Sequence, residues 1–248
     1  MIGFNLEAWH LLYILLPLAA FMYASVGHGG ASSYLMFLAL FGFLPEQIRP
    51  AALLMNMMVS FIAFLNFRRN VSFPQKLFIT LILFSMPAAY VGGSILVDTV
   101  LYKRILGIVL LFPILRFLNI FPAFGTFTIP QSFWLTAFIG VPIGFFSGLI
   151  GIGGGIILSP LLLMLGWTNV RETACISALF IFLNSLTGYI GASGWNVSID
   201  GVIWSLMPLT ILAGMLGSYF GAKRFNIDVV KYILTAVLAF ASVKFIIG

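Results

Sequence analysis

The stretch Gly151-Ile152-Gly153-Gly154-Gly155 decides the fold, because a similar stretch, Gly27-His28-Gly29-Gly30, lies half a chain length before it. Each stretch follows a long apolar run and precedes a shorter one. Glycine has no side chain and permits backbone conformations that are closed to other residues. In a membrane protein, two such breaks at matching points of two halves predict paired interrupted helices around a central substrate site.

The composition predicts an all-α integral membrane protein. Hydrophobic residues make up 62% of the chain and charged residues 7%, whereas soluble domains carry about 25% charged residues. Apolar stretches of about 18 residues or more recur along the chain, and each is long enough to cross a bilayer. Helices satisfy their own backbone groups in lipid, so a helical bundle is expected. The net charge of +6 comes from basic residues scattered in short loops, which argues against nucleic-acid binding.

Ten apolar segments can be delimited, and two of them are short. The segments are 8–26, 31–44, 50–67, 74–97, 102–122, 131–150, 155–166, 171–192, 201–221 and 229–247. A helix of about 13 residues rises only about 20 Å, so 31–44 and 155–166 are each too short for a full crossing. Each is expected to form the second arm of a hairpin that turns at its glycine stretch inside the membrane. The alternative is ten complete, tilted spans, so the expected number of transmembrane segments is about 8–10.

The two halves of the chain correspond in spacing. Gly93-Ser94 and Gly217-Ser218 are separated by the same half-chain interval as the glycine stretches. We therefore expect a first transmembrane repeat over 1–122, a linker over 123–130 and a second transmembrane repeat over 131–248.

Charge predicts the orientation of the repeats. One set of loops contains Arg68, Arg69, Lys76, Arg116, Arg171, Lys223, Arg224 and Lys231, and the opposite set contains Arg49, Lys103, Arg104 and Lys244. Because cytoplasmic loops are enriched in Lys and Arg, the first set is expected in the cytoplasm and both termini outside. Each repeat then crosses the membrane an odd number of times, so the two repeats are inverted relative to each other.

The glycine stretches are candidate anion sites. A helix that begins inside the membrane leaves its first amides without helical partners and directs the positive end of its dipole at a ligand. Backbone amides could thus hold an anion without a charged side chain, and serine hydroxyls in the first turns could add donors. The alternative is that the glycines only allow close helix packing. The candidates here are Gly27, Gly29, Gly30, Ser32, Ser33, Gly151, Gly153, Gly154, Gly155 and Ser159.

Intramembrane polar side chains complete the candidate substrate-binding set. These are His28, Asn56, Cys175, Ser177 and Asn184. His28 could donate to an anion or carry a proton. Its counterpart in the second stretch is Ile152, so the site is expected to be asymmetric. Interhelical hydrogen bonding is the alternative role for each of these side chains.

The acidic residues fall at segment ends or in loops, so the buried carboxylate relay of many ion-coupled carriers is missing. Glu46 with Arg49, and Arg171 with Glu172, are expected to form solvated loop pairs, with gating of access as the alternative role. With two histidines, one cysteine and no buried acid, we expect no enzyme, no catalytic residue, no metal and no cofactor.

Several of these residues carry a resemblance to a known family. Ala24-Ser25-Val26-Gly27-His28-Gly29-Gly30, the stretch from Ser147 to Gly155 and Ser159-Pro160 resemble the motifs of the sulfite exporter TauE/SafE family of bacterial and archaeal permeases. Thr173-Ala174-Cys175-Ile176-Ser177 and Asn184-Ser185 are similar to the family's second-repeat pattern. His28 and Asn56 depart from the commoner pattern of the first repeat.

The resemblance implies a multi-pass protein of the prokaryotic cytoplasmic (inner) membrane that moves sulfite, organosulfonates or related small anions. We therefore expect a secondary transporter that works by alternating access, with a passive anion channel as the alternative. Its expected partners are the small anion, the lipid bilayer and a coupling proton or sodium ion, and self-association stays open.

Overall fold

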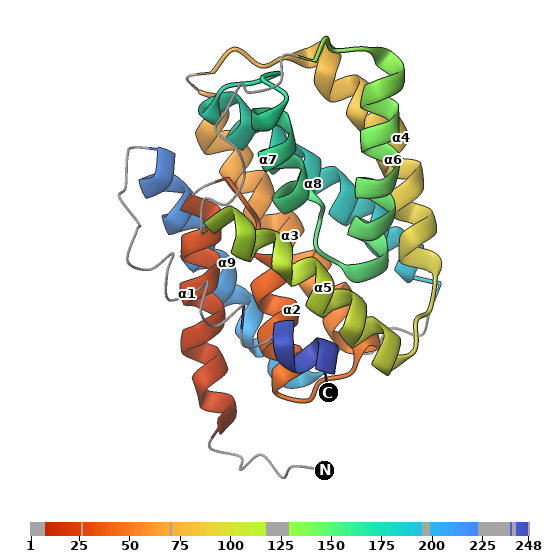
Figure 1. The fold of residues 1–248 in the computed structure, drawn as a ribbon. Coiled ribbons are helices and arrows are strands. Elements are labelled where there is room, and N and C mark those ends of the chain that lie inside the picture. Colours follow the sequence, from red (N-terminus) through yellow and green to blue (C-terminus); the bar gives the residue numbers. More distant parts are fainter. Residues whose placement is uncertain are drawn as a thin grey trace.

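A computed structural model describes residues 8–25, 27–69, 71–117, 129–194, 199–222, 239 and 242–247. Within these residues the chain forms helices and no strand, which confirms the all-α prediction (Figure 1). The elements are, in chain order, η1 (Ala8–Leu11), α1 (Leu12–Ser25), α2 (Ala31–Leu40), α3 (Pro45–Arg68), α4 (Gln75–Ser94), α5 (Thr99–Phe117), α6 (Phe133–Ile150), α7 (Gly155–Met164), α8 (Val170–Ala192) and α9 (Gly201–Ala222).

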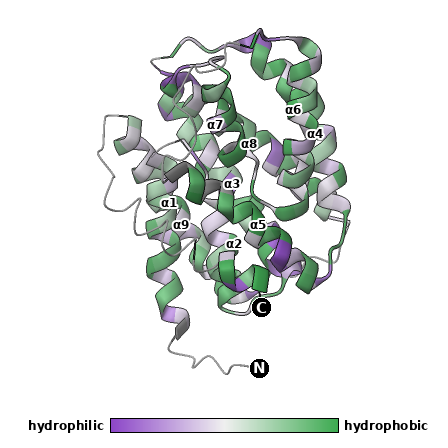
Figure 2. Cartoon of the chain, in the orientation of Figure 1, coloured by the Kyte–Doolittle hydropathy of each residue, from purple (hydrophilic) through white to green (hydrophobic). Residues whose placement is uncertain are grey.

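The surface of the bundle is apolar, as a membrane protein requires. In the described part of the chain, α3, α4, α6, α8 and α9 are long and apolar enough to span a bilayer. Hydrophobic residues cover the helices and strongly hydrophilic residues gather towards the two ends of the molecule (Figure 2). Trp134 and Phe138 on α6 are 79% and 77% exposed, which costs little where lipid is the solvent.

The two short helices form hairpins with the helices before them. Helices α2 and α7 each have 10 residues and so rise about 15 Å, half of a hydrocarbon core of about 30 Å. Figure 1 shows the α1–α2 hairpin entering from the lower end and the α6–α7 hairpin from the upper end, with both tips in the middle. This arrangement favours interrupted helices over ten complete spans.

Glycines let two helix pairs approach until their backbones touch. At several glycines, four of which bear on the hairpins, an added Cβ would overlap a carbonyl oxygen of the neighbouring helix. These contacts pair Gly144 with Ser85, Gly148 with Ala89, Gly217 with Phe21, and Gly221 with Ser25. Helix α6 thereby packs on α4, and α1 packs on α9, which fixes the outer arms of both hairpins.

One predicted boundary is wrong in a way that matters for the site. The segment expected to begin at Pro50 begins five residues earlier, with Pro45 in the first turn of α3. Proline is well suited to the first helical position, where its missing N–H costs nothing. Arg49 therefore belongs to the helix, and it is only 1% exposed. The expectation that Arg49 forms a solvated loop pair with Glu46 is wrong.

The matching pair in the second half also differs from expectation. Glu172 accepts from the backbone amide of Asn169 (2.9 Å), and the Asn169 side chain accepts from the amides of Arg171 (3.0 Å) and Glu172 (2.9 Å). This reciprocal arrangement caps the start of α8. Glu172 thus acts as a helix cap in the described structure.

Some predictions lie outside the described residues. They include most of the 123–130 linker, most of the 229–247 segment, and the loop residues Lys223, Arg224 and Lys231.

Candidate functional site

Each hairpin tip ends at a glycine that starts the second helix. Gly30 precedes α2 with φ 91°, and Gly154 precedes α7 with φ 77°. Both values lie in the left-handed region, which non-glycine residues adopt only at a cost. No side chain of the described residues caps either helix start. Because both helices begin at the hairpin tips, the positive end of each helix dipole points into the interior of the protein.

The backbone amides at the two tips are available donors. No described residue accepts a hydrogen bond from the amides of Gly29 and Gly30 in the first tip. In the second tip, the amides of Gly153, Gly154 and Gly155 also have no acceptor among the described residues. Such groups in the middle of a membrane protein are costly unless a ligand or water completes them.

Asn56 of α3 joins the two tips. It is 0% exposed, and its Nδ2 donates to the carbonyl of Ile152 (3.3 Å) and to the Ser185 hydroxyl (3.1 Å). Its Oδ1 lies beside Gly29, where an added Cβ would overlap it. A Cβ at Gly153 would overlap Nδ2 in the same way. One carboxamide is therefore in close contact with both glycine stretches.

A second connection runs through His28. Its Nε2 lies 3.0 Å from the Ser159 hydroxyl of α7, which in turn lies 2.7 Å from the Ser177 hydroxyl of α8. The Ser159 hydroxyl also contacts the carbonyl of Gly155 (2.8 Å). The predicted residues His28, Ser159 and Ser177 are thus brought together, although they are far apart in the sequence.

The remaining candidates take other positions. Ser32 and Ser33 lie beside the Tyr23 hydroxyl, and Gly27 packs against Ala174. Gly151 ends α6 in the left-handed region with φ 93°.

Two candidates on α8 contact other parts of the protein: Cys175 packs between helices, and Asn184 forms a hydrogen bond within its own helix. Cys175 packs with Ala63 and Phe64 in the contact between α3 and α8. Asn184 donates to the Phe180 carbonyl of its own helix (2.9 Å). Among the described residues, neither side chain forms a hydrogen bond with the glycine stretches.

Arg49 supports the second tip, and sequence reasoning missed this role. Its Nη1 donates to the carbonyl of Ile95 (3.0 Å), and its Nη2 to those of Gly148 (3.2 Å), Gly92 and Gly93 (both 3.4 Å). A cation is thus placed at the carboxyl ends of α4 and α6, where the helix dipoles favour positive charge. The helix end that it holds comes directly before Gly151.

Two buried tyrosines also hold the tips and were missed. Tyr34 donates to the carbonyl of Gly29 (2.7 Å), and Tyr102 donates to that of Ile150 (2.8 Å). Tyr102 also lies under Arg49, with the guanidinium carbon 6.0 Å from the ring centroid. Both tyrosines sit in apolar runs, so the sequence offered no signal for their hydrogen bonds.

The described residues contain no group of three or more His, Cys, Asp or Glu side chains that could hold a metal ion. The groups that the described centre presents are backbone amides, hydroxyls, one imidazole and one carboxamide. These groups are suited to binding a small polar molecule.

Replacing Ser159 by alanine should lower the free energy of unfolding by about 1–2 kcal/mol, since the contacts with His28 and Ser177 are lost. Thermal or denaturant unfolding of the purified protein measures this change. The matched control is Ser193→Ala, because the exposed Ser193 hydroxyl, at the end of α8, donates to the Ile190 carbonyl and to no other described residue. Equal effects of the two substitutions would contradict the role assigned to Ser159.

Comparisons with known proteins agree with this architecture. The model of the sulfite exporter TauE/SafE family matches residues 12–245. The chain is 31% identical over 230 residues to the probable membrane transporter protein y4hK of Sinorhizobium fredii, covering 91% of this chain and 93% of the relative. No solved structure matches the chain.

More distant similarity extends to larger proteins. The chain is 28% identical over 131 residues to the probable membrane transporter protein MamO of Magnetospirillum gryphiswaldense, covering 50% of this chain and 21% of the relative. It is also 27% identical over 131 residues to the probable membrane transporter protein MamO of Paramagnetospirillum magneticum, covering 50% of this chain and 20% of the relative. All three relatives bear the names of membrane transporters.

Proposed function

The chain belongs to the sulfite exporter TauE/SafE family, and from this premise we propose that it is a secondary transporter of small anions in the prokaryotic cytoplasmic membrane. The observation that carries the proposal is the meeting of two uncapped helix starts at Asn56 in the middle of the protein. The anion binds between the two glycine stretches, and sulfite or an organosulfonate is the first candidate.

The groups at the two tips favour an anion over a cation. The amino ends of α2 and α7 each contribute about half a positive charge, and the amides of Gly29, Gly30, Gly153 and Gly154 supply donors. The buried Arg49 adds a full positive charge behind the second tip. No carboxylate in the described residues is buried to offset these charges.

Alternating access is supported by the correspondence between the two halves. Gly27 of the first tip packs against Ala174 near the start of α8, and Gly151 of the second tip packs against Arg49 near the start of α3. Each tip thus rests on the third helix of the other half. Two inverted repeats of this kind would expose the central site to either side by rocking against each other.

The close packing around the centre favours a carrier over an open channel. Asn56, Ser177 and Ser185 are each 0% exposed, so these side chains have no contact with bulk water in the described structure. A carrier needs such an occluded centre, whereas a conducting pore does not.

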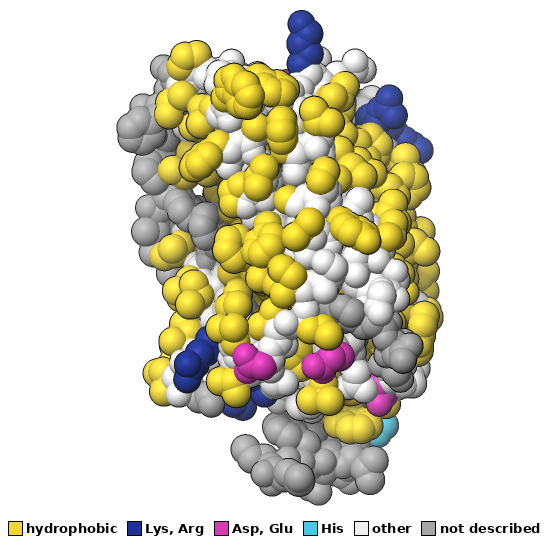
Figure 3. Space-filling model, turned by 90° about the vertical axis from the view of Figure 1, so that its right-hand side faces the viewer, with side chains coloured by type: hydrophobic (Ala, Val, Ile, Leu, Met, Phe, Trp, Pro, Cys, Tyr) yellow, Lys and Arg dark blue, Asp and Glu magenta, His cyan; other side chains and the backbone are white. Residues whose placement is uncertain are grey.

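Charge supports the orientation with both termini outside. On the face shown in Figure 3, the upper end presents only basic side chains, whereas the lower end presents acidic side chains beside basic ones. The ends of the helices agree with this view. One end of the bundle contains Arg68, Arg69, Lys76, Arg171 and Glu172, and the opposite end contains Glu46, Asp98, Lys103, Arg104, Asp200 and Lys244. The positive-inside rule places the first, net positive end in the cytoplasm.

Binding to the purified protein tests the proposed function. Sulfite, sulfoacetate, taurine and sulfate are titrated separately, with thermal stabilisation and calorimetry as readouts. Saturable binding of at least one of these anions is expected. If a folded protein binds none of them and transports none into liposomes, the proposed function is wrong.

A further inference from the structure

The orientation of the Asn56 carboxamide is set by its surroundings. Its nitrogen has two acceptors, the Ile152 carbonyl at 3.3 Å and the Ser185 hydroxyl at 3.1 Å. A flipped carboxamide would place its oxygen against the Ile152 carbonyl oxygen, so the flip is disfavoured. Oδ1 is consequently directed at Gly29, at the start of the α2 tip.

The Asn56 side-chain oxygen is a buried acceptor that lacks a hydrogen-bond donor among the described residues. Asn56 is 0% exposed, and Oδ1 accepts no hydrogen bond from any residue that the structure describes. Burying such a group costs about 1–3 kcal/mol. Native proteins complete nearly all buried polar atoms, so an exception next to a binding site calls for a functional explanation.

The surroundings of this oxygen show what would complete it. Gly29 lies against Oδ1 and Gly153 lies against Nδ2 of the same carboxamide. The amides of both glycines have no backbone acceptor among the described residues, so the oxygens of a small anion can accept from them. Oδ1 itself can only accept. An anion with acceptor oxygens alone would place one of them against Oδ1, and this repulsion is strong in a low-dielectric interior.

We propose that Asn56 Oδ1 is a specificity-determining group that accepts a hydrogen bond from the bound anion. It selects anions that carry their own donor, such as a hydroxyl, an ammonium group or an acidic proton on the oxyanion. This inference rests on the proposed function and narrows its substrate class. Sites built to pair with a donor discriminate strongly against analogues without it, because a buried group is then left unpaired.

A matched pair of sulfonates tests the proposal. Dissociation constants are measured by calorimetry for 2-hydroxyethanesulfonate and ethanesulfonate, which differ by one hydroxyl. Hydrogensulfite and methanesulfonate form a second pair, in which the donor lies on the oxyanion itself. We expect the donor-bearing member of at least one pair to bind at least about tenfold more tightly to the wild-type protein.

Variants then assign the preference to Asn56. In Asn56→Leu, and in Asn56→Ser in case the leucine variant does not fold, the affinity ratio within the pair should fall to about 1. The control is Asn66→Leu on the same helix, where the side chain bonds to Ser218 (2.8 Å) away from the glycine stretches. This control should keep the wild-type ratio.

The outcomes separate the two claims. Binding of both members of each pair with equal affinity would overturn the role of Asn56 and leave the anion transporter intact. If both Asn56 variants still bind the donor-bearing anion more tightly, the role of Asn56 is likewise overturned and the anion transporter stays intact. Absence of binding by every member of both pairs would count against the proposed function and this inference together.

Discussion

Gly29→Ala should reduce sulfite uptake into liposomes at least about tenfold, although the protein still inserts and folds. The φ angle of Gly29 lies outside the left-handed region, so the backbone itself accepts alanine. The new methyl group would overlap Asn56 Oδ1. The Asn56 side chain must then move away from Gly29. This movement breaks its hydrogen bonds to Ile152 and Ser185, and the contact between the two tips is lost.

The matched control for this substitution is Gly201→Ala. Gly201 also lies outside the left-handed region, and an added Cβ there meets no atom of the described residues within 4 Å. This variant should transport at the wild-type rate. If Gly29→Ala transports like Gly201→Ala, the tip around Gly29 does not form the binding site.

Arg49→Met should lower the free energy of unfolding by about 2–4 kcal/mol, because buried carbonyls at two helix ends lose their donor. The carbonyls concerned are those of Gly92, Gly93, Ile95 and Gly148. Arg49→Lys should recover only part of this loss, since an ammonium group cannot span both helix ends as a guanidinium does. Chemical unfolding in detergent measures the change.

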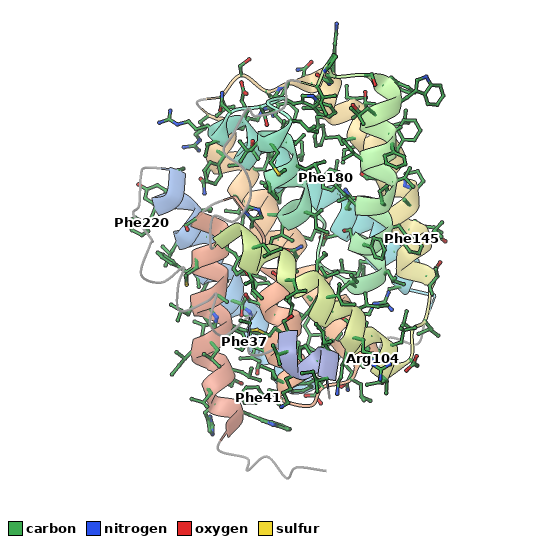
Figure 4. The ribbon with its side chains drawn as sticks, viewed as in Figure 1. Phe37, Phe41, Arg104, Phe145, Phe180 and Phe220 are labelled. Carbon is green, nitrogen blue, oxygen red and sulfur yellow. The ribbon has the colours of Figure 1, made fainter. Side chains whose placement is uncertain are left out.

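Arg104→Met provides the control for Arg49. Arg104 is an exposed residue on α5, and its label lies at the lower end of the molecule in Figure 4. Its replacement removes the same charge and should change the free energy of unfolding by less than about 0.5 kcal/mol. Equal losses for Arg49→Met and Arg104→Met would show that the carbonyl contacts contribute nothing to stability.

The parts of the fold that depend on local signals could be predicted from the sequence. The glycine stretches predicted both helix breaks, since a left-handed residue before a helix nearly requires glycine at Gly30 and Gly154. The short apolar runs predicted the two 10-residue helices. Hydropathy predicted the long spans, because a membrane helix must be apolar over most of its length.

Contacts between distant segments could not be predicted in this way. A membrane helix is apolar around most of its surface, so periodicity does not reveal which face of α3 is turned inward. The candidate status of Asn56 followed from its polarity, but its contacts with both glycine stretches required the structure. The sequence offers two prolines as the start of α3, and the helix begins at Pro45 rather than at Pro50, which puts Arg49 inside it.

The most direct test of the central claim is to locate a bound anion. Selenite resembles sulfite in charge and shape, and the anomalous scattering of selenium in crystals of the wild-type protein would reveal its position. We expect one strong selenium peak between Gly29 and Gly153, within hydrogen-bonding distance of Asn56. A fully occupied selenite site elsewhere in the protein, with no peak at Asn56, would contradict the account.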